Sequence, residues 1–116
     1  MIPFANDTVT LFHVLDAGIM GQVIHGCSYR RTGRRMHQDS AAADANEVTC
    51  RIPAGSIAPA PGDVICLGAV KDAAATAIEL TRLLERHRAD GAFRVQSVAD
   101  NARPGMPCPH YAARGA

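Results

Sequence analysis

The sequence predicts a mainly β fold with one α-helix, in the order β-β-β-β-α-β-β, built as a small bent sheet or a six-stranded β-barrel. Two observations lead to this prediction. Short segments along the chain alternate apolar and polar residues with the period of two expected of half-buried strands, whereas one late segment has helical periodicity. The length of 116 residues fits a single domain, residues 1–116, with one modest core. Closure into a barrel would also remove the sheet edges that apolar strands otherwise leave open.

Four strands are expected before the helix, at residues 7–14, 22–30, 47–52 and 64–67. The first two pair most simply as a hairpin around a glycine-containing loop at 16–21. Gly26 interrupts the second strand, which predicts a bulge or a close backbone approach. Pro53 ends the third strand and begins an irregular segment that runs to Gly62. The strand at 64–67 is a continuous apolar run, so we expect it to be the most buried.

The helix is expected to begin at Thr76 and to end before Gly91. Thr76 and Glu79 fit a capping box, in which both side chains bind backbone N–H groups at the start of the helix. The leucines of the segment fall on one face and its charged residues on the other; these leucines are Leu80, Leu83 and Leu84. Gly91 suits the left-handed position that follows many helices. We expect this helix to plug the barrel.

Two strands are expected after the helix, at residues 93–98 and 110–112. Asp100-Asn101 and Pro104-Gly105 lie between them and have the composition of turns, because Asn and Asp bind their own backbone and Gly tolerates positive φ. The patterned end of the chain is typical of a terminus that belongs to a sheet.

Composition and charge restrict the classes of function. The formal net charge is +1, so the chain as a whole is not strongly attracted to nucleic acid or to an anionic membrane. The longest apolar run, Val64 to Val70, is far shorter than the roughly 20 residues that span a bilayer. The first four residues lack the basic and apolar regions of a secretory signal. We therefore expect a protein made in the cytoplasm, with reduced cysteines and no membrane partner.

No metal, no cofactor and no catalytic residue is expected. The cysteines are irregularly spaced and form no zinc-ligand motif; they are Cys27, Cys50, Cys66 and Cys108. The sequence has neither a glycine-rich phosphate loop nor the turn that presents a nucleophilic serine. A structural role suffices for Asp63 and Asp100, which have turn residues beside them, and His13 and His25 are expected to be half-buried hydrogen-bonding residues. We therefore expect that the chain is not an enzyme.

Positive charge is concentrated around the start of the long segment 31–46, which we expect to be a mobile loop. The candidate contact residues are Arg30, Arg31, Arg34, Arg35 and His37. One interpretation is a solvated hairpin tip. A second is contact with nucleic-acid phosphates, with an affinity that falls steeply with salt. A third is pairing with carboxylates of a neighbouring subunit, for which the planar guanidinium is well shaped.

Four segments carry a further pattern. Residues 93–115 contain a valine-bearing strand, Asp-Asn, Arg, Pro-Gly and then a histidine, an aromatic and a small residue near the C-terminus. The other segments are residues 2–12, 50–53 and 61–65. In these segments the chain resembles small head-tail connector proteins of tailed bacteriophages and prophages, in particular the minor capsid or head-closure (stopper) group.

The resemblance implies a structural subunit of the phage neck, which forms a ring of identical copies between the portal or adaptor and the tail. The implied partners are copies of the chain itself, the portal or adaptor ring, and a tail-terminator or tail-tube protein, with packaged DNA near the 31–46 loop. The implied location is the neck of the virion. Two alternatives remain open: a tail-completion or terminator subunit, and a small β-barrel nucleic-acid-binding module that uses the arginine cluster.

Overall fold

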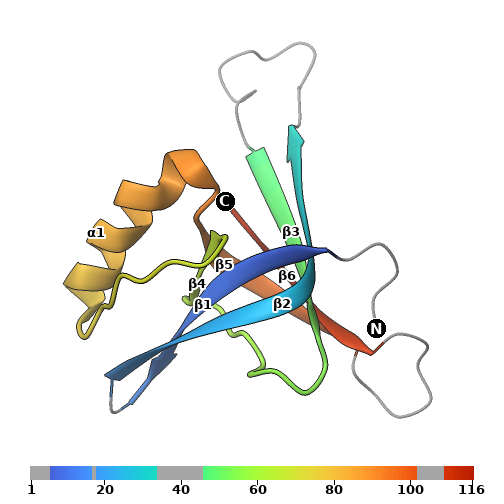
Figure 1. Ribbon diagram of the computed structural model, residues 1–116, viewed down its shortest axis with the longest axis horizontal. Coiled ribbons are helices and arrows are strands. Elements are labelled where there is room, and N and C mark those ends of the chain that lie inside the picture. The colour runs from blue at the N-terminus through green and yellow to red at the C-terminus, as the bar shows by residue number, and fades with distance from the viewer. Residues whose placement is uncertain (1–5, 17, 34–45, 102–108) are drawn as a thin grey trace.

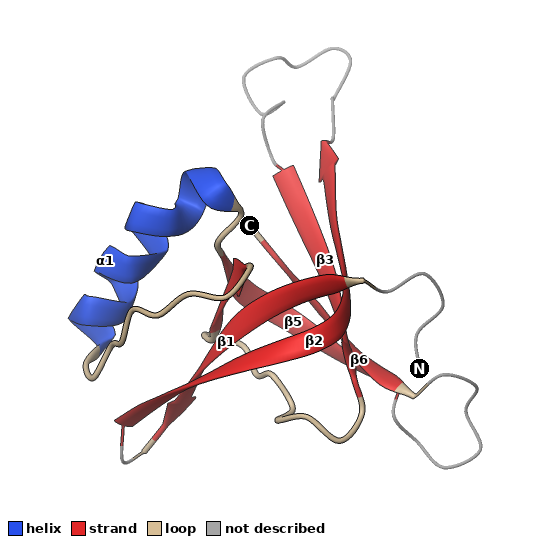
Figure 2. Ribbon diagram, viewed as in Figure 1, coloured by secondary structure: helices blue, strands red, loops and turns tan. Residues whose placement is uncertain are grey.

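The computed structural model describes residues 6–16, 18–33, 46–101 and 109–116, and they form a closed barrel of antiparallel strands with one α-helix. The predicted fold class and order of elements are confirmed (Figures 1 and 2). The barrel closes in the order β1-β2-β3-β6-β5-β4. Its elements are β1 (Asp7–Leu15), β2 (Gly18–Gly33), β3 (Asn46–Pro53), β4 (Val64–Leu67), α1 (Ala77–His87), a 3-10 turn η2 (Arg88–Asp90), β5 (Phe93–Asn101) and β6 (His110–Gly115).

Strand β2 spans 16 residues and joins the two sides of the barrel. Its first part pairs with β1 and its last part pairs with β3. Where the register shifts, His25 and Gly26 of β2 stand opposite the single residue Thr8 of β1. Gly26 has a φ of 75°, in the left-handed region that glycine adopts without strain. The predicted bulge at Gly26 is therefore confirmed, and it bends β2 between its two partners.

Strand pairing continues into three stretches that the sequence predicted as loops or turns. The expected loop at 16–21 is mostly strand, since Leu15 pairs directly with Gly18. Gly21 in this stretch is where the aromatic ring of Phe12 comes close: a Cβ on Gly21 would lie 3.1 Å from Phe12 Cε1. Residues 31–33 extend β2 rather than beginning the 31–46 loop, of which residues 34–45 lie outside the described residues. Asp100-Asn101 belongs to β5 and pairs with β6.

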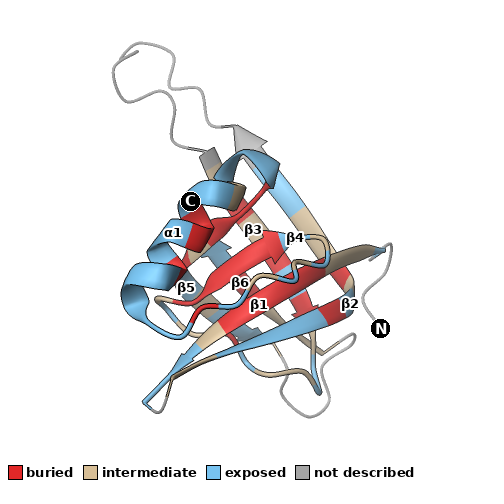
Figure 3. Ribbon diagram, turned by 60° about the vertical axis from the view of Figure 1, so that its left-hand side comes forward, coloured by how far each residue is buried: buried red, intermediate tan, exposed pale blue. Residues whose placement is uncertain are grey.

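The protein has two hydrophobic cores, one on each face of the wall formed by β1 and β4 (Figure 3). The inner core fills the barrel with one set of alternate strand residues: Val9, Leu11, Ile24, Cys27, Val48, Cys50, Ile52, Ile65, Phe93, Val95 and Ala113. The outer core lies between the wall and α1: Phe12, Val64, Cys66, Ala74, Leu80, Leu83, Leu84 and Ala92. The expectation that the helix plugs the barrel is therefore wrong. The helix covers the outside, because the barrel interior is already filled by strand side chains.

The caps of α1 follow the prediction. Thr76 Oγ1 accepts a hydrogen bond from the backbone N–H of Glu79 at 3.2 Å. The Glu79 carboxylate accepts one from the N–H of Ala75 at 3.0 Å, one residue earlier than a capping box requires. Gly91 follows η2 with a φ of 106°, as predicted for the residue that ends the helical segment. Within the described residues, no helix is long and apolar enough to cross a membrane.

Candidate interaction surfaces

The arginine face is the outer surface of β2, β3 and β6 around Arg30, Arg51 and Arg114. Cys27, Cys50 and Ala113 point into the barrel, so the alternate residues of the same three strands point outward. Thr49 of β3 stands opposite Arg30 on one side and opposite Arg114 on the other. Together with Ser28, these residues line a surface hollow of about 150 Å³.

The arginines of this face carry unpaired positive charge within the described part of the chain. All three are exposed, and none forms an ion pair with a carboxylate there. The side chains between them are small hydroxyl residues, Ser28 and Thr49, which are half-buried. The hollow therefore offers guanidinium and hydroxyl donors to a ligand from outside.

The contact residues predicted from the sequence do not all lie on the arginine face. Arg30 lies in the hollow. Arg31 is exposed but sits at the next position of β2, opposite Val48. It lies near the Tyr29 hydroxyl: burial raises the pKa of Tyr29, and the positive charge of Arg31 partly opposes this increase. Arg34, Arg35 and His37 lie outside the described residues.

Sequence reasoning missed two of the three arginines that meet here. Arg51 and Arg114 are 63 positions apart by their numbers and become neighbours only because β3 pairs with β6. Val48, Cys50 and Ile52 are apolar, so the alternation of residues 47–52 is enough to predict that Arg51 points outward. The alternation does not show which strand pairs with β3. That pairing sets the register and brings Arg114 beside Thr49.

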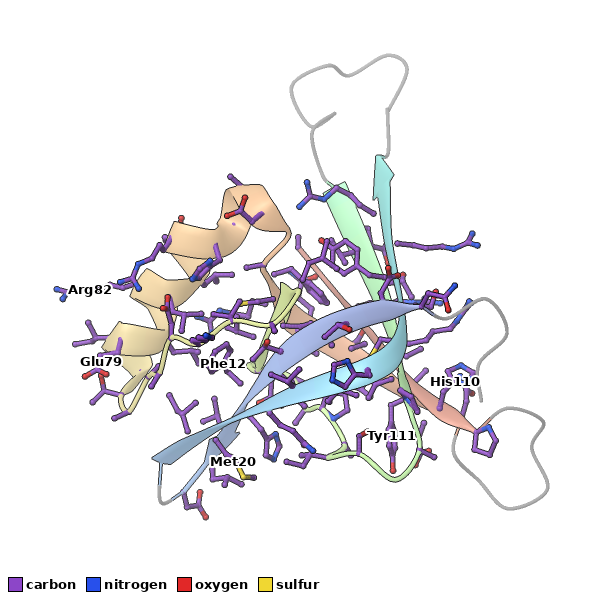
Figure 4. All side chains as sticks on the ribbon, in the orientation of Figure 1. Phe12, Met20, Glu79, Arg82, His110 and Tyr111 are labelled. Carbon is purple, nitrogen blue, oxygen red and sulfur yellow. The ribbon has the colours of Figure 1, made fainter. Side chains whose placement is uncertain are left out.

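An apolar surface lies at the other side of the barrel, at the turn end of the β1–β2 hairpin. Val14, Leu15 and Met20 are each more than two-fifths exposed, and Ile78 on α1 is 67% exposed. The hairpin end and the start of α1 border a groove of about 490 Å³ that also includes Arg94. We call these exposed side chains and the groove the apolar surface. Figure 4 shows Met20 near the end of the hairpin, on the same side of the molecule as α1.

A buried carboxylate holds the end of β1 against the segment before β4. Asp63 is 1% exposed, and its carboxylate accepts hydrogen bonds from the N–H groups of Val14 at 3.0 Å and Ala60 at 2.9 Å. It also accepts one from Nδ1 of His13 at 2.6 Å. His25 bonds instead to Thr8 Oγ1 at 2.9 Å. The hydrogen bonding predicted for both histidines is confirmed, and Asp63 has the structural contacts predicted for it. His13 is half-buried as expected, but His25 is exposed, so the burial predicted for His25 is wrong.

Comparison with protein-family models gives one result. A model matches residues 4–116. The chain belongs to DUF6751, a family of unknown function. No curated protein and no solved structure matched the chain.

The three cysteines that the structure describes in this DUF6751 member are surrounded by apolar side chains. Cys27, Cys50 and Cys66 are free thiols buried in the two cores. Burial raises the pKa of Cys66 to about 12, and a hydrogen bond with Cys27 together with burial raises the pKa of Cys50. Both thiols are therefore protonated at neutral pH. Among the described residues, no three His, Cys, Asp or Glu side chains gather as metal ligands.

Proposed function

We propose that this protein is a structural subunit of the neck of a tailed phage or prophage, a head-closure or stopper-like protein in a ring that joins the portal or adaptor to the tail. The resemblance in residues 2–12, 50–53, 61–65 and 93–115 supports this proposal. The structural observation that carries it is the apolar surface, because exposed apolar side chains gathered beside a groove at one end of a small barrel are typical of an interaction site.

The arrangement of the surfaces suits a ring subunit. A ring forms when one surface of each copy binds a different surface of the next, so the subunit needs two unlike contact regions. In the barrel order, β3 and β6 lie across from β1 and β4, whose outer face α1 covers. The arginine face and the apolar surface therefore lie on different sides of one small barrel. β2 and β3 also extend beyond the rest of the barrel at the end where Gly33 pairs with Asn46 (Figure 1).

The direct test is to locate the chain in particles produced by the phage or induced prophage that encodes it. We expect mass spectrometry to detect it in purified virions, and cryo-electron microscopy to show a ring of small barrels between portal and tail. A ring at the far end of the tail tube would favour the tail-completion alternative. Absence from complete virions would refute the proposal.

A variant pair tests the surface that carries the proposal. Leu15→Glu with Met20→Glu places charge on the apolar surface without touching either core, so the barrel should still fold. We expect this variant to fail to assemble into particles. The matched control is Arg88→Glu, which changes the charge by the same amount at an exposed position in η2, at the end of the helical segment away from Ile78. Normal assembly of the Leu15/Met20 variant would contradict the role given to this surface.

A further inference from the structure

The strongest unassigned feature of the molecule is the arginine face. The chain has a net charge of only +1, yet three arginines meet over one hollow with no carboxylate paired to them within the described residues. We propose that the hollow bounded by Arg30, Arg51 and Arg114 is a phosphate-binding site, which takes phosphate groups of a nucleic-acid backbone. The arginines would bind phosphate in this way whether or not the protein belongs to a phage neck.

The register of the strands sets the shape of the site. Arg30, Thr49 and Arg114 lie side by side on three neighbouring strands, which are about 4.8 Å apart in a sheet. Arg51 lies two residues further along β3 than Thr49, about 7 Å away on the same face. The three side chains start from points spread over about 10 Å and line a common hollow of about 150 Å³.

The donors of the site match phosphate better than a carboxylate. Each guanidinium presents several N–H donors in a planar fork, and the hydroxyls of Ser28 and Thr49 add two more groups at the floor. A single protein carboxylate can pair with the fork of one arginine, but it does not extend across a face on which three arginines are spread. The two charged oxygens of a backbone phosphodiester point outward from a tetrahedral phosphorus, and successive phosphates along a strand place further acceptors beside the other arginines.

The openness of the face favours a phosphate that belongs to a polymer. The arginines are exposed on the outside of a barrel rather than enclosed in a pocket, so a single free phosphate would remain largely hydrated. A backbone can instead cross the face and place successive phosphates beside different arginines. None of the described residues that line the hollow is aromatic, so we expect no base stacking on them and little dependence of binding on base sequence.

The experiment measures binding of labelled oligothymidylate and of a DNA duplex to the purified full chain, between about 50 and about 200 mM salt. We expect binding that weakens with salt. Arg30→Ala with Arg114→Ala should weaken binding by about tenfold at the lower salt and reduce the slope of log K against log salt by about 1.4 for the single strand. Arg51→Lys keeps the charge but loses the fork, so it should have a smaller effect than Arg51→Ala.

The charge-matched control is Lys71→Ala with Arg82→Ala, which removes two exposed positive charges far from the hollow. Binding by this control should stay close to that of the unchanged chain, and thermal unfolding should show that both double variants remain folded. Equal loss in the two double variants, or no binding to either nucleic acid at the lower salt, would overturn the proposal.

Two competitors identify the source of the phosphate. Inorganic phosphate that displaces oligothymidylate only at concentrations far above those of the polymer would support a backbone site. Displacement by inorganic phosphate at concentrations similar to those of the polymer would show a site for small phosphates and overturn the assignment to a polymer. Poly-glutamate that binds through the same arginines while oligothymidylate does not would show a carboxylate surface instead, and would also overturn the proposal.

Discussion

Strands β1 and β4 on one side of the barrel differ from β3 and β6 on the other side in what their outward-facing residues do, although side chains alternate between the two faces in all four strands. In β1, the neighbouring residues Leu11 and Phe12 point to opposite faces and both are buried, one in each core. In β3, Cys50 is buried inside the barrel whereas the next residue, Arg51, is exposed outside it. The difference comes from α1, which covers the outside of β1 and β4 and not the outside of β3 and β6 (Figure 3).

In this small protein, the residues needed for stability and the residues available for binding lie on different sides of the barrel. A wall that is covered on both sides must present apolar side chains on both faces, as the strands of a helix-covered sheet do. A wall that is covered on one side needs only its inner residues for stability. Its outer positions are free to carry arginines, because exposed charges cost little stability. The covered half should therefore be sensitive to substitution, and the open half tolerant.

The largest expected effect is that of Phe12→Ala in the covered half. Phe12 packs against the leucines of α1, and a Cβ on Gly21 would lie 3.1 Å from its ring. Truncating a buried phenylalanine leaves a cavity and should lower the free energy of unfolding by about 3–5 kcal/mol, measured by urea denaturation. Arg51→Ala, in the open half, should change it by less than about 0.5 kcal/mol. Similar losses in the two variants would abolish the contrast.

The next largest effect is expected for Asp63→Ala, which removes the carboxylate that links the end of β1 to the segment before β4. The substitution leaves two backbone N–H groups and the His13 ring without their buried acceptor. We expect a loss of about 3 kcal/mol in the free energy of unfolding. Asp16→Ala removes a nearby but exposed carboxylate and should have little effect. If Asp63→Ala were as mild as this control, the covered half would not depend on the carboxylate.

A smaller effect is expected at the start of α1. Thr76→Ala removes the acceptor for the N–H of Glu79 and should lower the free energy of unfolding by about 1 kcal/mol. Thr76→Ser keeps a hydroxyl at the same position and should restore most of the loss. Because α1 creates the outer core, the loss should be accompanied by faster amide hydrogen exchange in α1 than in β3 and β6. Equal acceleration in all three elements would show that the helix does not open separately.

The smallest effect concerns pH. A hydrogen bond from His87 and then one from Arg86 lower the pKa of Asp72, which ties the segment before α1 to the end of the helix. Since the folded pKa lies below the ordinary value of about 3.9, the contact contributes fully above that value and is lost as pH falls through the lowered pKa. Carboxyl titration by NMR should show the low midpoint, and His87→Ala should move it upward. An unchanged midpoint in this variant would contradict the assignment.

The sequence by itself determined the local parts of this protein. Alternation located most of the strands, and a continuous apolar run located β4. Gly26 indicated the bulge in β2, and Thr76 and Gly91 marked the limits of the helical segment. These features depend on residues close together in the chain, such as a hydroxyl three positions from the N–H it accepts from. They could be predicted because interactions between residues close together in the chain do not depend on which distant segments pack against them.

Only the tertiary structure decided which faces are covered and which charges meet. The helix lies outside the barrel because the strands fill the interior themselves, and no helical periodicity could reveal that. Strand pairing extended β2 to Gly33 and drew Asp100-Asn101 into β5, against their turn-like composition. Arg51 and Arg114 became neighbours through the register of β3 with β6. Register and closure are set by contacts between distant segments, so their outcome is absent from any local pattern.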